Sequence, residues 1–295
     1  MPHVHDEKIK ELEIMANKIR QSIIEMLTTA GSGHTAGPLG MADVFTALYF
    51  HTLNHDPKNP EWENRDRLLL SAGHIVPVQY SAMAHAGYFP MRELNTLRKL
   101  GSRLQGHPER LRLPGIETTP GPLGEGLSQA CGMAYGARMD KKWFRIYCIM
   151  SDGEQQEGNT WEAIMFAGKN RLSNITAIMD RNNIQIDGIV EDIMPLEPLR
   201  ERYESFGWHV LEINGHDFED IISACEQAHA ITTKPVLIIA HTIPGKGIPE
   251  IEFDYRWHGV PPGKGPGDKV PQDEQKKHFL HDLRTLKGKI ESEHQ

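Results

Sequence analysis

The chain has 295 residues, of which 39% are hydrophobic and 24% charged, and this composition is ordinary for a soluble globular protein. Its formal net charge of −8 argues against a nucleic-acid-binding or anionic-membrane-binding surface, and its three cysteines without CxxC spacing predict neither a disulfide framework nor a zinc site. The apolar runs are far shorter than the about 20 residues of a membrane span, and the N-terminal stretch is polar, without a secretory signal. We therefore expect a cytoplasmic protein without a nucleic-acid or membrane partner.

Taken in order, the chain alternates between helical and extended patterns. Apolar residues at three- and four-residue spacing predict an amphipathic helix over 8–30, which Gly31-Ser32-Gly33 ends. The remaining patterns predict strands over 66–71, 144–150, 175–179, 208–213 and 235–240, of which the first is buried. They predict helices over 41–53, between His74 and Gly87, and over 90–101, 127–139, 160–170 and 218–230, of which the one over 90–101 is short. The stretch over 189–206 is expected to be partly helical.

This alternation predicts an α/β fold: a doubly wound, mostly parallel sheet with helices on both faces. We expect one large binding domain over 1–270, in which the proline- and glycine-rich stretch 248–270 is a loop or lid. Residues 271–295 are charged and weakly helical, and we expect them to form a solvated helical tail.

One glycine-rich stretch formally matches a dinucleotide-binding pattern. The segment from Gly31 to Ala36 fits G-x-G-x-x-G/A. That fingerprint must follow a strand and open a helix, whereas this segment follows a long helix and leads into a proline. We reject the match.

Polar side chains follow several of the predicted strands. His74, Asp152, Asn182 and the loop after Ala240 all stand at strand ends, where the ligands of parallel sheets bind. Asp152 and Asn182 offer hard oxygen ligands for Mg²⁺, the backbone carbonyl of Ile184 is a third, and Gly153 leaves room for a diphosphate. The alternative is a plain strand-end turn, because Asp-Gly and Asn-Asn are common turn formers. Spacing alone leaves both interpretations open.

A second glycine-rich turn, Gly121-Pro122-Leu123-Gly124-Glu125-Gly126, opens the helix over 127–139. Free backbone N–H groups at a helix N-terminus bind anions well, but a tight packing turn has the same composition. The turn alone does not separate these possibilities.

The chain resembles the thiamine-diphosphate-binding half of transketolase. Six segments carry the resemblance in family order: Ser32-Gly33-His34 with Pro38-Leu39-Gly40, Leu70-Ser71-Ala72-Gly73-His74, Gly106-His107-Pro108-Glu109, the turn from Gly121 to Gly126, Ser151-Asp152-Gly153-Glu154 through Asp180-Arg181-Asn182-Asn183-Ile184, and Trp257-His258-Gly259. Two positions depart from the family pattern, since Ser151 stands where glycine is usual and Glu125 where glutamine is usual. Neither departure removes a metal ligand.

The resemblance implies a role for each matching residue. Asp152, Asn182 and the Ile184 carbonyl would bind Mg²⁺. The imidazoles of His34, His107 and His258 would face the substrate and the reaction centre. The remaining implied cofactor-binding residues are His74, Gly121, Pro122, Leu123, Gly153, Glu154, Glu157 and His241, with Glu157 close to the interface between paired sites and His241 at the rim together with Lys246.

The resemblance also implies an activity and a partner. The chain would be the N-terminal subunit of a split transketolase that uses thiamine diphosphate and Mg²⁺ to move a two-carbon ketol unit from a ketose phosphate to an aldose. It would need a partner subunit with the pyrimidine-binding and C-terminal domains, in an α2β2 assembly that self-associates through the cofactor-binding face, and would be inactive alone. The alternatives are a subunit similar to 1-deoxyxylulose-5-phosphate synthase or to a 2-oxoacid dehydrogenase, and a non-catalytic binding module.

Overall fold

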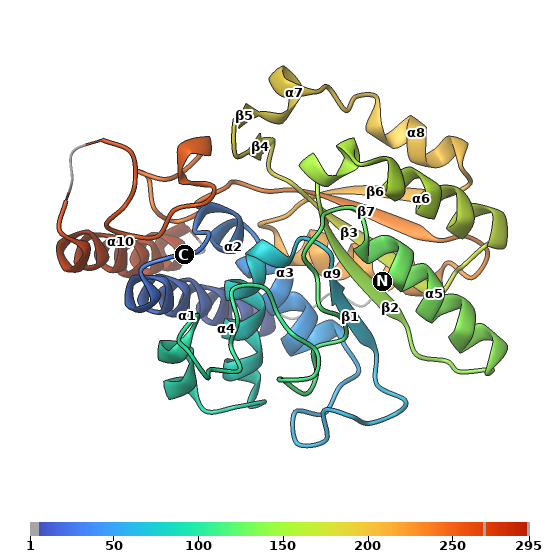
Figure 1. Ribbon diagram of the computed structural model, residues 1–295, viewed down its shortest axis with the longest axis horizontal. Coiled ribbons are helices and arrows are strands. Elements are labelled where there is room, and N and C mark those ends of the chain that lie inside the picture. The colour runs from blue at the N-terminus through green and yellow to red at the C-terminus, as the bar shows by residue number, and fades with distance from the viewer. Residues whose placement is uncertain (1–5, 268–269, 294–295) are drawn as a thin grey trace.

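The computed structural model describes residues 6–267 and 270–293, and its centre is a parallel β-sheet (Figure 1). The strands lie in the order β1 (Arg67–Leu70), β2 (Ile146–Ser151), β3 (Ile175–Arg181), β7 (Val236–His241) and β6 (His209–Asn214). Every neighbouring pair in this sheet is parallel. The central strands β2, β3 and β7 are short, mostly apolar and almost fully buried runs, as expected for strands that are covered on both faces, whereas the edge strand β6 alternates between buried and more exposed side chains.

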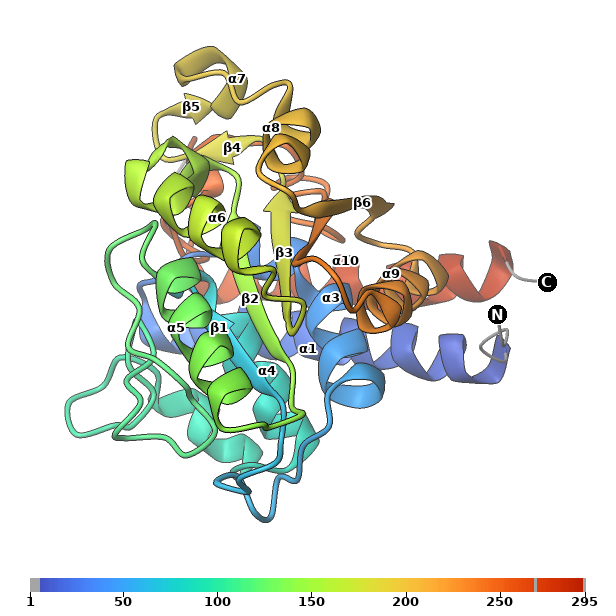
Figure 2. The same ribbon diagram turned by 90° about the vertical axis from the view of Figure 1, so that its right-hand side faces the viewer.

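Helices cover both faces of the sheet (Figure 2). Side chains that alternate along the strands separate the two cores. In β2, Tyr147 and Ile149 join the larger core, whereas Cys148 and Met150 point to the other face. The larger core is covered by α1 (Asp6–Ala30), α2 (Ala36–Gly40), α3 (Ala42–Ala47), α4 (Val76–Ala86), α9 (Phe218–Ala230) and α10 (Gln272–Glu293). The smaller core is covered by α5 (Gly126–Met139), α6 (Gly158–Asn170) and α8 (Leu199–Ser205). The expected doubly wound α/β architecture is therefore confirmed.

Local sequence signals set the ends of several helices. Gly31 adopts a left-handed φ of 62° and its N–H donates to the Leu27 carbonyl at 2.9 Å, which ends α1 as expected. Asp217 caps α9, because its side chain accepts hydrogen bonds from the backbone N–H groups of Glu219 and Asp220. Among the described residues, no helix is both long and apolar enough to cross a bilayer.

Three stretches differ from the sequence-based expectation in their local structure. The helix expected over 41–53 is broken into α3 and a π-helical turn, Leu48–Thr52. The helix expected over 90–101 is a 3₁₀ turn, Met91–Thr96. The stretch from Asn182 to Gly188, which we expected to be a polar loop, instead forms most of a small antiparallel hairpin of β4 (Ile184–Gln185) and β5 (Gly188–Ile189), and the one-turn helix α7 (Val190–Ile193) follows.

The expectation of a solvated C-terminal tail was wrong. Helix α10 lies along α1, and Phe279 is 0% exposed. The Phe279 ring packs edge-on against Trp257 at 5.6 Å between ring centroids, and Asn17 of α1 donates to the Leu283 carbonyl at 2.8 Å. Charged residues dominate the sequence of α10, but one face of the helix is apolar and joins the larger core. The boundary at residue 270 itself stays a prediction.

Candidate functional site

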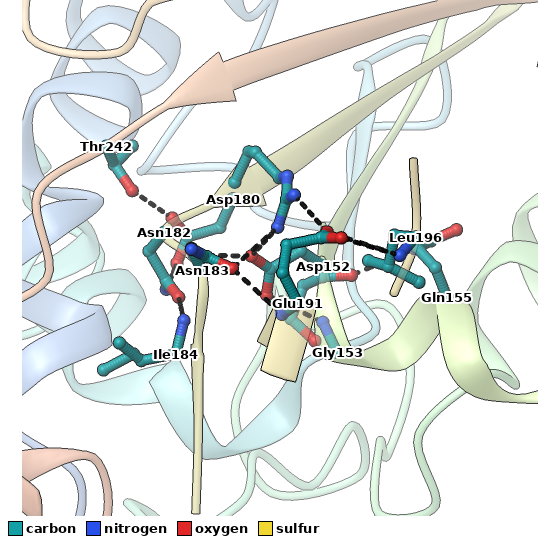
Figure 3. A network of polar contacts seen from close by, with 12 residues as sticks. Asp152, Gly153, Gln155, Asp180, Asn182, Asn183, Ile184, Glu191, Leu196 and Thr242 are labelled. Carbon is teal, nitrogen blue, oxygen red and sulfur yellow. Dashed lines mark hydrogen bonds and ion pairs between the residues drawn. The ribbon is translucent and has the colours of Figure 1, made fainter. Parts of the chain in front are cut away.

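The carboxyl ends of β2 and β3 bring Asp152 and the Asp180–Ile184 stretch together (Figure 3). Asp152 follows β2 and is only 1% exposed. Its Oδ1 accepts the Gly153 N–H at 2.7 Å, while its Oδ2 accepts the Asn183 N–H at 2.6 Å and Arg181 Nη1 at 3.1 Å. Burial raises the pKa of the Asp152 carboxyl even though the nearby Arg181 favours its charged form. Asp152 is therefore a buried carboxylate held in one orientation.

Asn182 is held just as firmly at the end of β3. Its amide nitrogen donates to Asp180 Oδ2 at 2.8 Å, and its Oδ1 accepts the Ile184 N–H at 3.0 Å. Asp180 in turn accepts a hydrogen bond from the hydroxyl of Thr242, which follows β7. Burial is the main cause that raises the pKa of Asp180, to about 7. Three neighbouring strands thus contribute to one network.

The donor set at these strand ends suits a divalent cation that is shared with a diphosphate. A carboxylate offers about four lone-pair directions, and Asp152 uses three of them in the bonds above. No group of three or more histidine, cysteine, aspartate or glutamate residues that could bind a metal occurs in the described ranges. One carboxylate with an amide and a carbonyl instead fits a cation that takes its other ligands from phosphate, which is how Mg²⁺ commonly binds.

The glycine-rich turn before α5 is fixed to the same strand ends by Glu154. This side chain is 0% exposed. Its carboxylate accepts the Gly124 N–H at 2.8 Å, the Ser151 N–H at 3.2 Å and the hydroxyl of Ser71. Burial raises the pKa of Glu154, and these hydrogen bonds oppose the shift. Glu154 therefore positions the turn through contacts with protein groups.

Ser151, which departs from the family pattern, has a local function. Its hydroxyl accepts the Glu154 N–H at 3.3 Å, and its carbonyl accepts the Gln155 side-chain amide at 3.0 Å. The hydroxyl thus satisfies a backbone donor in the turn that follows β2. Glu125, the other departure, is exposed at the start of α5.

Three of the expected histidines form a triangle. The ring centroids lie 4.8 Å apart for His34 and His74, 5.4 Å for His34 and His258, and 5.2 Å for His74 and His258. A Cβ added to Gly73 would lie 2.7 Å from the His107 ring, so the fourth histidine is next to them. Gly126 N–H donates to Ser71 Oγ at 3.0 Å, which connects the loop before His74 to the start of α5.

The environment keeps these imidazoles neutral near pH 7. Burial lowers the pKa of His34 to about 3, with His258, Arg98 and His107 adding to the effect. Burial also lowers the pKa of His74, His258 and His107. Neutral imidazoles each carry one donor and one acceptor, which suits hydrogen bonding to sugar hydroxyls.

Several buried polar atoms of the site have no hydrogen-bond partner in the described part of the chain. Among the described side chains, the buried atoms without a hydrogen bond include His34 Nδ1, His258 Nδ1 and Gln185 Oε1. Gln185 Oε1 lies 3.4 Å from the point where a Cβ on Gly153 would stand. Buried polar groups are normally satisfied, so these atoms are consistent with a bound ligand.

The structure does not bring every expected site residue into this cluster. Gly121, Pro122 and Leu123 lie on the turn before α5, where Gly121 and Leu123 are exposed, and Glu157 is exposed beside it, close to Gly124. His241 follows β7, but its side chain is 56% exposed and contacts Glu212 at 3.1 Å. Their expected cofactor contacts therefore stay predictions.

Comparison with known proteins identifies the family. The model of the transketolase thiamine diphosphate binding domain matches residues 12–277. The chain belongs to the transketolase family. This assignment confirms the expected family, and the family cofactor is thiamine diphosphate with a divalent metal. The buried Asp152, the amide of Asn182 and the unpartnered imidazoles are compatible with that pair.

Relatives of this transketolase chain include separate subunits as well as long single chains. A 6-deoxy-6-sulfo-D-fructose transketolase subunit from a Clostridium species is 46% identical over 80% of this chain and 86% of its own length. One subunit of the apulose-4-phosphate transketolase from Phocaeicola vulgatus is 42% identical over 86% of this chain and 90% of its own length. The crystal structure of Campylobacter jejuni transketolase matches 98% of this chain with a TM-score of 0.80 and 35% identity, and the chain spans 48% of that protein.

These comparisons confirm that the chain is a transketolase subunit of the N-terminal type. Sequence reasoning nevertheless missed three residues of the site: Ser71, Arg181 and Glu191. The available signal for Ser71 and Arg181 was that both lie inside segments that had already been singled out. In the structure, Ser71 contacts Glu154 and Arg181 contacts Asp152. Nothing in the local sequence signalled Glu191, because it reaches the site through the hairpin and α7.

Proposed function

We propose that this chain is the diphosphate-binding subunit of a two-chain transketolase, which transfers a two-carbon ketol unit from an anionic ketose to an aldose. The single observation that carries the proposal is the triangle of His34, His74 and His258, which loops join to the same sheet edge as Asp152 and Asn182. A site for a cation and a diphosphate then lies beside groups that contact sugar hydroxyls.

The strand-end residues bind and orient the cofactor in this proposal. Asp152, Asn182 and the Ile184 carbonyl hold Mg²⁺, and Gly153 leaves space for the diphosphate. When bound, thiamine diphosphate supplies the nucleophilic carbon that accepts the ketol unit. Glu154 keeps the Gly121–Gly126 turn in register with β2, so that the turn lines the cofactor.

The histidines orient the sugar and hold its protons. His34 and His258 each have an unpartnered Nδ1 to share with a hydroxyl, and His107 lies next to Gly73. Their low pKa keeps them neutral near pH 7, so each can accept a hydrogen bond from one hydroxyl while donating one to another. These three are the proposed catalytic residues.

We propose that the donor is a ketose with an anionic group at its far end. Two relatives are named for such sugars, one for a sulfonate and one for a phosphate. Both are named as transketolase subunits, and the two names differ in the sugar and its anionic group. The shared task of this chain would then be ketol transfer, while the partner subunit selects the anionic end.

The partner is the second part of the proposal. Exposed apolar side chains gather on the outer faces of α5 and α6, namely Tyr135, Met139, Met165 and Phe166, with the Tyr135 and Phe166 rings 5.9 Å apart. Exposed Leu123 and Glu157 lie on the turns at the N-terminal ends of these helices. We propose that this surface, together with the cofactor-binding face, is covered in an α2β2 assembly with a second copy and two partner chains. Three free buried cysteines, Cys131, Cys148 and Cys225, support a cytoplasmic location.

Reconstitution tests the proposed function. The chain would be mixed with a candidate partner that carries the pyrimidine-binding domain, thiamine diphosphate and Mg²⁺, and assayed with fructose 6-phosphate, its 6-deoxy-6-sulfonate analogue, xylulose 5-phosphate and pyruvate. We expect ketol transfer from at least one ketose only when both chains are present, and size-exclusion chromatography with light scattering should give the mass of an α2β2 complex. Turnover of pyruvate, or robust turnover by this chain alone, would contradict the proposal.

A further inference from the structure

A buried arginine contacts the carboxylate that is expected to bind the metal. The side chain of Arg181, the last residue of β3, is only 8% exposed. Its Nη1 donates to Asp152 Oδ2 at 3.1 Å, while its Nη2 donates to Glu191 at 2.5 Å and to Glu197 at 3.2 Å. One guanidinium thus joins the metal carboxylate to two other carboxylates.

The two glutamates belong to a stretch that is itself well held. We call residues 184–197, which contain β4, β5 and α7, the cover segment. The Glu191 N–H donates to Asn183 Oδ1 at 3.3 Å, and the Glu191 carboxylate accepts the Leu196 N–H at 3.2 Å. Gln156 donates to the Met194 carbonyl at 3.1 Å, which fixes the segment to the turn after β2. The position of the Arg181 side chain therefore depends on the cover segment.

Arg181 and a divalent cation compete for the lone pairs of the Asp152 carboxylate. Asp152 Oδ2 already accepts two hydrogen bonds, one of them from Arg181. A guanidinium is always charged, so it also repels a cation that binds this carboxylate. Glu191 and Glu197 act in the opposite direction, because they share the guanidinium and offset its charge. The balance between these carboxylates sets how freely Asp152 can bind a metal.

We propose that Arg181 is a positioning residue that restrains metal loading, and that Glu191 and Glu197 of the cover segment relieve this restraint. The inference rests on the proposed function, since it concerns the same Mg²⁺ and thiamine diphosphate. It adds a residue that changes the Mg²⁺ concentration needed for half-saturation, which we call the Mg²⁺ demand. It also makes this Mg²⁺ demand depend on the cover segment.

The test measures the Mg²⁺ demand by binding and needs no turnover. The complex of this chain with its partner subunit would be titrated with Mg²⁺ at a fixed, saturating concentration of thiamine diphosphate, and the half-saturating Mg²⁺ concentration would be read by calorimetry and near-ultraviolet circular dichroism. We expect Arg181→Gln to lower this concentration by about tenfold, because one repelling charge is removed. Glu191→Gln and Glu197→Gln should raise it by about threefold or more, because the guanidinium then turns more fully to Asp152.

Two further measurements keep the inference falsifiable. Arg103→Gln breaks another arginine–glutamate pair, with Glu93 at 2.9 Å, in a different part of the fold and should leave the Mg²⁺ demand unchanged. Glu197 is 59% exposed, so Glu197→Gln should fold even if Arg181→Gln does not. An unchanged Mg²⁺ demand in both glutamate variants, or a higher demand in folded Arg181→Gln, would overturn the inference. A wild-type complex without Mg²⁺-dependent cofactor binding would instead contradict the proposed function, and the inference with it.

Discussion

The Glu154 carboxylate accepts the Gly124 backbone N–H at 2.8 Å, across 30 residues of sequence. The same carboxylate also accepts the Ser71 hydroxyl and the Ser151 N–H, so one buried side chain joins the ends of β1 and β2 to the turn before α5. The strand ends that we propose bind the metal and the loop before His74 are thereby held in a fixed relation. This arrangement and the packing around it lead to four predictions.

Replacing Glu154 by alanine should destabilise the chain and loosen the site. The change leaves three donors without an acceptor in a buried place, and we expect the free energy of unfolding to fall by about 2–4 kcal/mol. Urea unfolding followed by circular dichroism measures this loss. Glu157→Ala is the matched control, because Glu157 is exposed three residues further on, and it should change stability by no more than about 0.5 kcal/mol. Equal effects of the two variants would show that Glu154 does not hold the turn.

Two glycines of α5 should respond in opposite ways to alanine. A Cβ on Gly126 would lie 2.3 Å from Ser71 Cβ, whereas a Cβ on Gly132 would meet nothing within 4 Å. Gly126→Ala should therefore cost roughly 1–3 kcal/mol through overpacking. Gly132→Ala should gain roughly 0.5–1 kcal/mol from helix propensity. Thermal unfolding of the two variants decides this, and a stabilised Gly126→Ala would contradict the close approach of α5 to the end of β1.

The histidine triangle should make the chain sensitive to acid. The pKa of His34 is about 3 in the folded state and about 6.5 in an unfolded chain, so the unfolded state binds the extra proton between these values. The contribution of neutral His34 to the free energy of unfolding is therefore complete above pH 6.5 and is lost as the pH falls towards 3. The loss at pH 5, relative to pH 7.5, should reach about 2 kcal/mol for this one histidine.

Variants isolate the contribution of His34 to acid sensitivity. His34→Gln should lose less stability than wild type between pH 7.5 and 5, as measured by urea unfolding at both values. His229→Gln removes an exposed histidine of α9 and should keep the wild-type difference. An acid loss in His34→Gln as large as that of the wild type would mean that His34 is not held neutral by its surroundings.

Strands and strand-end ligands were predictable from the sequence, because both depend on local rules. The apolar run before Ser151 and the run before Asp180 are continuous, and parallel strands place their carboxyl ends at one edge. Asp152 and Asn182 could therefore be placed together without a structure. The proximity of His34 to His258 was not accessible in this way, because 224 residues and no shared element separate them, and only the resemblance to a family paired them.

The structure of the cover segment and the packing of α10 could not be predicted, for two different physical reasons. The β4–β5 hairpin is only two residues long on each side, and its position depends on hydrogen bonds that start from Asn183. Helix α10 is mostly polar, and its few apolar residues become meaningful only when α1 is seen beside it. Short ladders and sparse apolar faces gain their stability from tertiary contacts, which local patterns do not contain.

The buried face of α10 leads to the last prediction, which concerns His258. Phe279 packs against Trp257, the residue before His258, and both aromatic rings are buried. Phe279→Ala should lower the free energy of unfolding by about 3–5 kcal/mol and leave a cavity beneath Trp257. Trp257 would then reach solvent more often, so the tryptophan emission should shift to longer wavelength and cofactor-dependent dichroism should weaken as His258 loses support. Lys277→Ala, on the exposed face of the same helix, should leave stability and emission unchanged. If Phe279→Ala behaves like Lys277→Ala, then α10 does not support the Trp257–His258 loop, and the helix is the solvated tail that its composition suggests.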